Sequence, residues 1–368
     1  MFKTSILKKN RFKTCMLFLL AGAVALSTAA CSTGTGSTSS EDSAPTSSHH
    51  KSIDKLNVYF VPSKDPGQII TATEPLKNLL KTELAKEYYD VNTVNISVGT
   101  TYEAVGEALS AGTADVGFIP GGTYVMYDDA ADVLLTATRA GLDKNSDNPK
   151  DWNNGKETQP TTTQVTSYRS LLIAGPSAKG KELAAKVNAG QKLTFDDLNT
   201  ANWSVMSSSS SAGYIYPTLW LQKNFKKNIT DLTHAVQADS YGSAFARLAS
   251  GQVDIVCAYA DARIDYAKQW NTTFGRSASI WDETNVIGVT PPIYNDTISV
   301  SKSSKIMTPA FKKALQTAFI NIGNSTEGKA VIAIYSHQGY KPAKSSDYDN
   351  ERAAQKLIRS MSSATSSK

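Results

Sequence analysis

The stretch V-M-S-S-S-S-S-A-G-Y-I-Y-P-T-L-W-L, residues 205–221, contains five consecutive serines between two patterned segments. Residues 203–206 are expected to end a β-strand, whereas residues 213–224 have the apolar spacing of an amphipathic helix. A strand-to-helix junction presents free backbone N–H groups and the positive end of a helix dipole. Since the serine hydroxyls add further donors, the junction predicts a site for an oxyanion such as phosphate or phosphonate. A flexible serine loop is the alternative.

Before residue 141 the chain alternates between strand and helix patterns. Apolar, β-branched runs predict strands, and runs with helical apolar spacing predict helices between them. The expected strands are residues 56–61, 94–98 and 114–119, and the expected helices are residues 73–87, 101–111 and 123–131. This order predicts a parallel α/β sheet, in which ligands bind at the carboxyl ends of the strands.

Residues 141–166 lack apolar periodicity and predict a long surface hairpin or loop, after which the alternation resumes. The later elements are expected at strands 170–174, 203–206, 232–235 and 253–259, helices 182–188, 213–224 and 243–249, a return strand within 286–298, and helices 308–322, 327–336 and 348–361. We therefore expect a first lobe at 53–166, a second lobe at 167–290, and a return to the first lobe at 291–368. The ligand would lie in the cleft between the lobes, and closure would be a hinge motion.

The N-terminus is typical of an export signal. Five basic residues and no acid precede an apolar stretch at residues 15–26, which is too short to span a bilayer well. The small residues S-T-A-A before Cys31 resemble a lipobox, so we expect a signal peptide at 1–30 and a diacylated Cys31 on the outer face of the cell membrane. Ordinary cleavage near Ala30 is the alternative. Residues 31–52 are mostly small and polar and predict a flexible tether.

Charge and composition exclude several kinds of function. The whole chain carries a formal charge of +5, but loss of residues 1–30 removes five basic residues and leaves the rest near neutral. Without a broad basic face, nucleic-acid binding is not expected. Clusters of histidine and acid with metal-ligand spacing are absent from the sequence, so we expect no metal and no cofactor. Cys257 lies in an apolar strand pattern and is expected to be a buried, inert thiol.

Five motifs, in this order and spacing, resemble one family: the substrate-binding proteins of phosphonate, phosphite and phosphate ABC importers. The motifs are T-T-Y-E-A-V-G-E-A-L (100–109), A-D-V-G-F-I-P-G-G-T-Y (114–124), S-S-S-S-S-A-G-Y-I-Y-P (207–217), G-Q-V-D-I-V-C-A-Y-A-D (251–261) and P-P-I-Y-N-D-T-I (291–298). The resemblance covers about residues 56–353. It implies a two-lobed periplasmic-binding-protein fold of type II-like form, with each lobe a mostly parallel sheet flanked by helices.

The resemblance also implies which residues hold the oxyanion. Tyr102 matches a tyrosine of the first lobe whose hydroxyl meets the phosphoryl group. Ser210 and Ser211 match a hydroxyl pair, and the Ala212 N–H would add a donor. Thr123, at an expected helix start, would supply a further donor.

Three more positions bear on the choice of ligand. Asp261 and Asp296 match carboxylates that neutralise the ammonium group of an aminophosphonate, with helix capping or a surface charge as the alternative. Tyr241 stands where the family commonly has a histidine, and a phenol donates a hydrogen bond but carries no positive charge near neutral pH.

The expected function is capture of a small phosphorus oxyanion by a monomeric, membrane-anchored lipoprotein, which delivers it to the permease of an ABC importer. Two alternatives remain open at this point. A sulfonate offers the same three oxygens, and a secreted hydrolase would use the serines after the strand. No G-x-S-x-G elbow, H-E-x-x-H helix or Walker loop supports an enzyme.

Overall fold

The computed structural model describes residues 50–366, with side chains as far as Ile358 and at Ser360. The expected signal peptide, Cys31 and most of the tether lie outside the described residues. The first strand begins at Lys51, so the last two residues assigned to the tether belong to the sheet. In this described part of the chain, no helix has the length and apolar character needed to cross a membrane.

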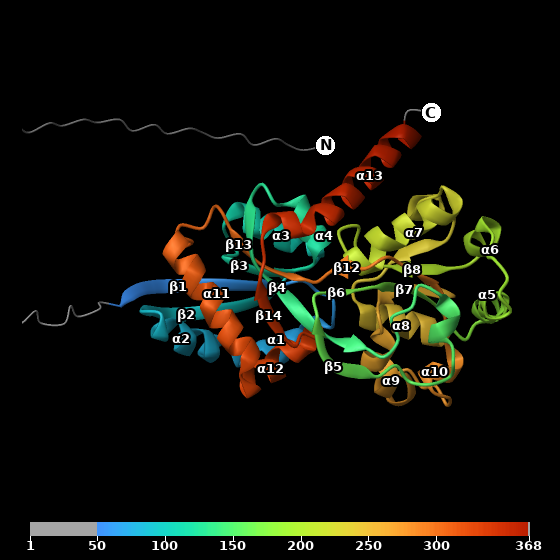
Figure 1. Ribbon diagram of the computed structural model, residues 1–368, viewed down its shortest axis with the longest axis horizontal. Helices are drawn as coiled ribbons and strands as arrows, with labels where there is room; N and C mark the ends of the chain where they lie inside the picture. Colours follow the sequence, from blue (N-terminus) through green and yellow to red (C-terminus); the bar gives the residue numbers. More distant parts are fainter. Residues whose placement is uncertain (1–49, 367–368) are drawn as a thin grey trace, which may run out of the picture. The chain divides into compact units, whose positions relative to one another are not determined.

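The first lobe is built on a seven-stranded sheet (Figure 1). Its strands are β1 (Lys51–Phe60), β2 (Tyr89–Val98), β3 (Val116–Ile119), β4 (Ala131–Leu142), β5 (Pro160–Val165), β13 (Thr297–Ser301) and β14 (Gly339–Pro342). The order is β14-β4-β13-β3-β1-β2, and β5 pairs with β4. Strand β1 is parallel to β2 and β3, whereas β13 runs antiparallel to both β3 and β4.

The second lobe is built on a five-stranded sheet with the order β11-β7-β10-β8-β9. Its strands are β7 (Ser170–Ala174), β8 (Trp203–Val205), β9 (Ala235–Gln237), β10 (Ile255–Tyr259) and β11 (Asn285–Val289). Strand β8 is parallel to both of its neighbours, β9 and β10, and β7 is antiparallel to β10 and β11. The two-lobed α/β fold is thus confirmed, but both sheets are mixed instead of mostly parallel. The chain passes from one lobe into β7 of the other, and later returns into β13. Each of these two strands is antiparallel to both of its neighbours.

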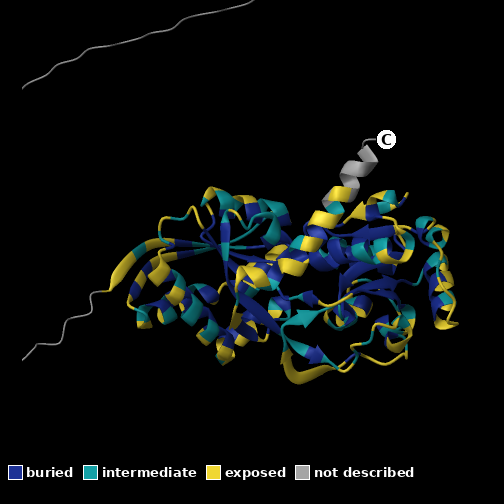
Figure 2. Ribbon diagram, turned by 45° about the horizontal axis from the view of Figure 1, so that its top comes forward, coloured by how far each residue is buried: buried dark blue, intermediate teal, exposed yellow. Residues whose placement is uncertain are grey.

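Helices connect and cover the strands (Figure 1). They are α1 (Pro66–Thr73), α2 (Leu76–Lys86), α3 (Tyr102–Ala111), α4 (Gly121–Met126), α5 (Ala178–Asn188), α6 (Phe195–Asn199), α7 (Tyr216–Phe225), α8 (Tyr241–Ser250), α9 (Ala262–Thr272), α10 (Ile280–Glu283), α11 (Pro309–Asn324), α12 (Thr326–Ile332) and α13 (Asp349–Ser366). A π-helical turn, Ser211–Ile215, precedes α7. Figure 2 shows that the centres of both sheets are buried, while the outer faces of the helices, the start of β1 and most of β5 are exposed.

The two lobes repeat one topology. Strands β1, β2 and β3 have the spatial order β2-β1-β3, and β8, β9 and β10 have the order β9-β8-β10. Helices α3 and α8 each begin with a tyrosine after a hydroxyl N-cap and end at a glycine with positive φ. Asp115 accepts from the backbone and side chain of Asn57 in the first lobe, and Asp254 does the same with Asn202 in the second.

Two segments can be compared with the sequence predictions. Residues 141–166, expected to form a long surface hairpin or loop, include the end of β4 and all of β5, which pair as a hairpin, so the hairpin alternative is confirmed. The expected return strand within 286–298 is three strands: β11 in the second sheet, β12 (Ile293–Tyr294), and β13 in the first sheet. Pro291 and Pro292 lack an N–H and therefore interrupt the ladder between them. Strand β12 pairs with β6 (Ser167–Tyr168), where the chain crosses between the two sheets.

Cys257 lies in the middle of β10 and is fully buried. Burial raises the pKa of its thiol because the thiolate would lose its hydration. The expectation of a buried thiol is confirmed.

Candidate functional site

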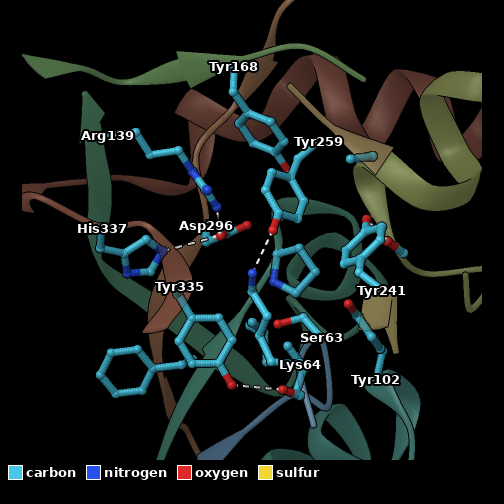
Figure 3. Close-up of a pocket in the computed structure, with 16 residues that line it drawn as sticks. Ser63, Lys64, Tyr102, Arg139, Tyr168, Tyr241, Tyr259, Asp296, Tyr335 and His337 are labelled. Carbon is cyan, nitrogen blue, oxygen red and sulfur yellow. Dashed lines mark hydrogen bonds and ion pairs between the residues drawn. The ribbon is translucent and has the colours of Figure 1, made fainter. Parts of the chain in front are cut away.

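A cavity of about 50 Å³ lies between the lobes, where the carboxyl ends of β1, β3 and β10 and the segment after β8 come together (Figure 3). Roughly 10–15 Å³ of cavity volume is enough for one water molecule. The cavity can therefore hold a group of a few non-hydrogen atoms, such as a tetrahedral oxyanion. Its polar lining includes five tyrosines, two cations, a carboxylate, a histidine and two serines: Tyr102, Tyr168, Tyr241, Tyr259, Tyr335, Lys64, Arg139, Asp296, His337, Ser63 and Ser210.

Two of these tyrosines begin equivalent helices. Tyr102 is the first residue of α3 and Tyr241 the first residue of α8, so each side chain lies at the positive end of a helix dipole. Ser210 lies between them, within hydrogen-bonding reach of Tyr102 and with its Oγ 3.5 Å from the Tyr241 hydroxyl. Burial raises the pKa of both phenols, which therefore remain protonated donors.

Lys64 places an ammonium group in the cavity immediately after β1. Its Nζ donates to the Tyr259 hydroxyl and to Asp265 Oδ2, both at 2.7 Å. Burial lowers the pKa of Lys64, although Asp265 opposes this shift. Because Lys64 belongs to the first lobe and Asp265 lies on α9 of the second, this ion pair also joins the lobes.

Arg139 and Asp296 form a second ion pair in the cavity wall. Arg139, on β4, lies 2.5 Å from Asp296 Oδ2, and its guanidinium is 4.8 Å from the centre of the Tyr168 ring. His337 Nε2 is 3.3 Å from the same carboxylate oxygen. Burial alone would raise the pKa of Asp296, but Arg139 and His337 outweigh it and hold the pKa at about 2. The carboxylate is therefore ionised, and its charge is already balanced by Arg139.

The structure brings Tyr102, Ser210, Ala212, Tyr241 and Asp296 together around this cavity. Of the predicted site residues, Thr123, Ser211 and Asp261 do not line it. Their polar atoms are occupied within the protein: Thr123 Oγ1 donates to Ser209 Oγ at 3.1 Å, and Ser211 Oγ accepts from the Gly122 N–H at 2.9 Å. Asp261 is fully buried in an ion pair with Arg263 at 2.7 Å and caps α9.

The serine run mostly joins the lobes. Ser207 and Ser208 donate to Glu103 of α3, while Ser209 and Ser211 bind residues of α4. The run belongs to the second lobe, and α3 and α4 belong to the first. Ser210 is the member of the run that lines the cavity, so the junction predicted to bind an oxyanion also connects the two lobes.

Lys64, Arg139, Tyr168, Tyr259, Tyr335 and His337 were missed by the sequence analysis. Two of them carry a local signal. Lys64 follows β1 in V-P-S-K-D-P, at the place in the first lobe that the serine run occupies in the second, and Tyr259 ends β10 within a family motif. Arg139 and His337 have no such signal, because only the pairing of β13 and β14 with β4 brings them together.

Two α/β lobes, two crossing segments and a small polar cavity between the lobes define the class of two-lobed solute-binding proteins. The chain belongs to the family of periplasmic substrate-binding proteins of phosphonate ABC transporters, whose family model matches residues 58–348. Members of this family are periplasmic substrate-binding components of transporters.

Solved structures show the same fold. A binding-protein component of a phosphonate ABC transporter from Pseudomonas aeruginosa superposes with a TM-score of 0.60 at 13% identity, covering 82% of this chain and 85% of that one. The methylphosphonate complex of PhnD1 from Prochlorococcus marinus gives 0.59 at 15% identity, covering 83% and 98%. The alkanesulfonate-binding protein SsuA from Xanthomonas axonopodis pv. citri, bound to MOPS, gives 0.50 at 11% identity, covering 84% and 94%. No curated protein matches the sequence.

Proposed function

We propose that this protein captures a small phosphorus oxyanion, namely phosphate, phosphite or a phosphonate with a small substituent, and delivers it to the permease of an ABC importer. The observation that carries the proposal is the cavity: two cations, protonated phenols and the Ser210 hydroxyl surround a space of about 50 Å³. Charge-assisted hydrogen bonds from such donors suit an anion with several oxygens. The family and the methylphosphonate complex of PhnD1 support the same class of ligand.

The pairing of Asp296 bears on the ligand's substituent. The sequence analysis expected this carboxylate to neutralise a ligand ammonium, but its negative charge is already balanced by Arg139. An aminophosphonate would therefore bring its ammonium group into a cavity whose lining carboxylate is already balanced by Arg139, at a substantial desolvation cost. The volume of the cavity also favours ligands without a long substituent.

The second carboxylate oxygen of Asp296 favours a phosphorus oxyanion over a sulfonate. Its Oδ2 contacts Arg139 and His337, whereas its Oδ1 accepts no hydrogen bond from any residue in the described part of the chain. A hydrogen phosphate or hydrogen phosphonate ion carries a P–OH group that can donate to this oxygen, whereas a sulfonate has no proton to donate. The SsuA neighbour nevertheless makes a sulfonate the second candidate.

Isothermal titration calorimetry of ligand-stripped protein tests the proposal against phosphate, phosphite, methylphosphonate, 2-aminoethylphosphonate and taurine. We expect at least one of the first three to bind at least about tenfold more tightly than 2-aminoethylphosphonate, which corresponds to roughly 1.4 kcal/mol. Taurine should give no heat. Binding of taurine alone would refute the phosphorus assignment, and turnover of a phosphonate or phosphate ester would refute the role as a binding protein.

We propose that the hinge for closure of the cleft lies at β6 and β12, the paired segments in which the chain crosses between the two sheets. In this arrangement residues 53–166 and 291–368 form one lobe and residues 167–290 the other. Several cross-lobe contacts, including the Lys64–Asp265 pair, would form only on closure. The liganded protein would then present both lobes to the permease in one fixed geometry.

The proposed location is the outer face of the cell membrane, with diacylated Cys31 as the anchor. The sequence S-T-A-A-C at residues 27–31 supports this location. We expect the wild-type protein in the membrane fraction and the Cys31→Ala variant in the soluble extracytoplasmic fraction. Cys257→Ala is the matched control, since it also removes a thiol but should remain membrane-bound. Equal membrane retention of Cys31→Ala and wild type would contradict a lipid anchor.

A further inference from the structure

A buried carboxyl group lies behind the serine run. Glu351 is in the first turn of α13 and has no exposed surface. Helix α13 packs on α4 of the first lobe and on the π-helical turn and α7 of the second lobe. Figure 1 shows the beginning of α13 beside α4. Glu351 therefore sits where the two lobes meet.

The contacts of Glu351 come from both lobes. From the second lobe, its Oε2 lies 3.5 Å from Ser211 Oγ, and the Tyr216 phenol is hydrogen-bonded to the carboxyl group. From the first lobe, Gly121 lies against the side chain so closely that an added Cβ would be 3.2 Å from Glu351 Cγ. Oε1 is buried and, within residues 50–358, has no hydrogen-bond partner.

No cation balances this carboxyl group among the described side chains. The groups that interact with it are the Ser211 hydroxyl on the π-helical turn and three phenols: Tyr216 on α7, Tyr348 just before α13, and Tyr168 on β6. Gln355, one turn further along α13, is also buried, and its amide nitrogen has no partner in the described part. The negative charge of Asp296 also acts on Glu351 and disfavours its ionised form.

We propose that Glu351 is a proton-binding site and that closure of the lobes around the ligand takes up a proton there. Closure would bury the carboxyl group without a cation. Burying a neutral carboxylic acid costs far less desolvation free energy than burying a carboxylate. On opening, Ser211 and Tyr216 would leave with the second lobe and water would reach the carboxyl group. Capture of the phosphorus oxyanion and uptake of a proton are then one coupled event, so this inference rests on the proposed function.

The direction of the pH dependence follows from the two states. Burial raises the pKa of Glu351 to about 8 in the closed form, with Asp296 acting in the same direction and the bonds from Tyr216 and Ser211 opposing it. In the open form the group should titrate near the ordinary glutamate pKa of about 4.3. The closed form therefore binds more protons than the open form between these values. Closure is favoured at low pH, and its advantage is lost as pH rises to about 8.

Ligand affinity measured against pH tests this coupling. The affinity for phosphate and for methylphosphonate is measured from pH 5.5 to 9 with wild type and with Glu351→Gln, whose amide cannot ionise. The ratio of the two affinities removes the titration of the ligand itself. We expect the wild-type to Glu351→Gln ratio to fall about tenfold per pH unit up to about pH 8 and then to level off. Glu327→Gln, which changes an exposed carboxylate on α12, should keep the wild-type profile.

Parallel pH profiles for wild type and Glu351→Gln would overturn the proton coupling while leaving the proposed function intact. Failure of phosphate, phosphite and methylphosphonate to bind at any pH would overturn the proposed function and the coupling with it. If Glu351→Gln does not fold, ¹³C carboxyl titration of wild type by NMR decides instead. One glutamate should titrate near pH 8 with ligand and near its ordinary pKa without it; the same value in both states would refute the inference.

Discussion

Replacing Arg139 by methionine should weaken binding of the phosphorus oxyanion at least about a hundredfold, which corresponds to roughly 3 kcal/mol. The substitution removes one of the two cations of the cavity and leaves Asp296 as a partly buried carboxylate without its arginine partner. Removing one partner of a buried ion pair typically costs about 3–5 kcal/mol. The remaining negative charge would also repel an anionic ligand. Calorimetry with phosphate and methylphosphonate measures the loss.

A second variant distinguishes the effect of losing the Arg139 cation from the effect of leaving Asp296 without its partner. In Arg139→Met/Asp296→Asn both charges are removed, so we expect part of the affinity to return. Arg276→Met is the control for loss of an arginine ion pair as such, because Arg276 pairs with Glu283 on α10 and does not line the cavity. Full affinity in Arg139→Met would show that the ligand does not occupy this cavity.

Replacing Lys64 by methionine should have an effect of similar size, through two routes. The variant lacks the other cation of the cavity, and it leaves Asp265 without its partner across the lobes. We therefore expect affinity to fall by about a hundredfold and the ligand-induced compaction seen by small-angle X-ray scattering to diminish. Lys77→Met, which breaks an exposed pair with Glu74 on the surface of the first lobe, should change neither quantity.

The double variant Lys64→Met/Asp265→Asn distinguishes the two routes. Removal of the unpaired Asp265 carboxylate should restore closure, whereas affinity for the ligand should remain low because the cavity still lacks the Lys64 ammonium group. Recovery of both closure and affinity would mean that Lys64 acts only between the lobes. Wild-type affinity in the single variant would contradict any role of Lys64 in the site.

Local sequence patterns located the elements that carry the first half of the site. Helix α3 was expected at 101–111 and is Tyr102–Ala111, because Thr101 caps its start and Gly112 takes the left-handed conformation at its end. Strand β7 has the expected bounds, 170–174. Both signals act within a few residues, so local patterns could locate these elements. The residues themselves came from elsewhere: Tyr102 from the family resemblance, and Ser210 from the serine run together with that resemblance.

The second half of the site depends on contacts between distant residues. Arg139 and Asp296 are 157 residues apart, and the register of β4 against β13 brings them together. No local pattern could predict that Asp296 would meet a cation of the protein before any ligand ammonium. Asp261 was assigned to the site for the same chemical reason, but Arg263 and Thr158 bind it inside the protein.

The sequence by itself determined the alternation of strands and helices, the two lobes, the family, and the serine-rich junction at residues 207–211. These features follow from periodicity, capping and turn residues, which act over short distances. Only the tertiary structure decided how each polar group is used. It left Ser210 at the cavity, turned the neighbouring serines toward α3 and α4, and paired Asp296 with Arg139. Hydrogen bonds and charges are satisfied by whichever partner the folded chain brings within reach, and that partner is set by long-range packing.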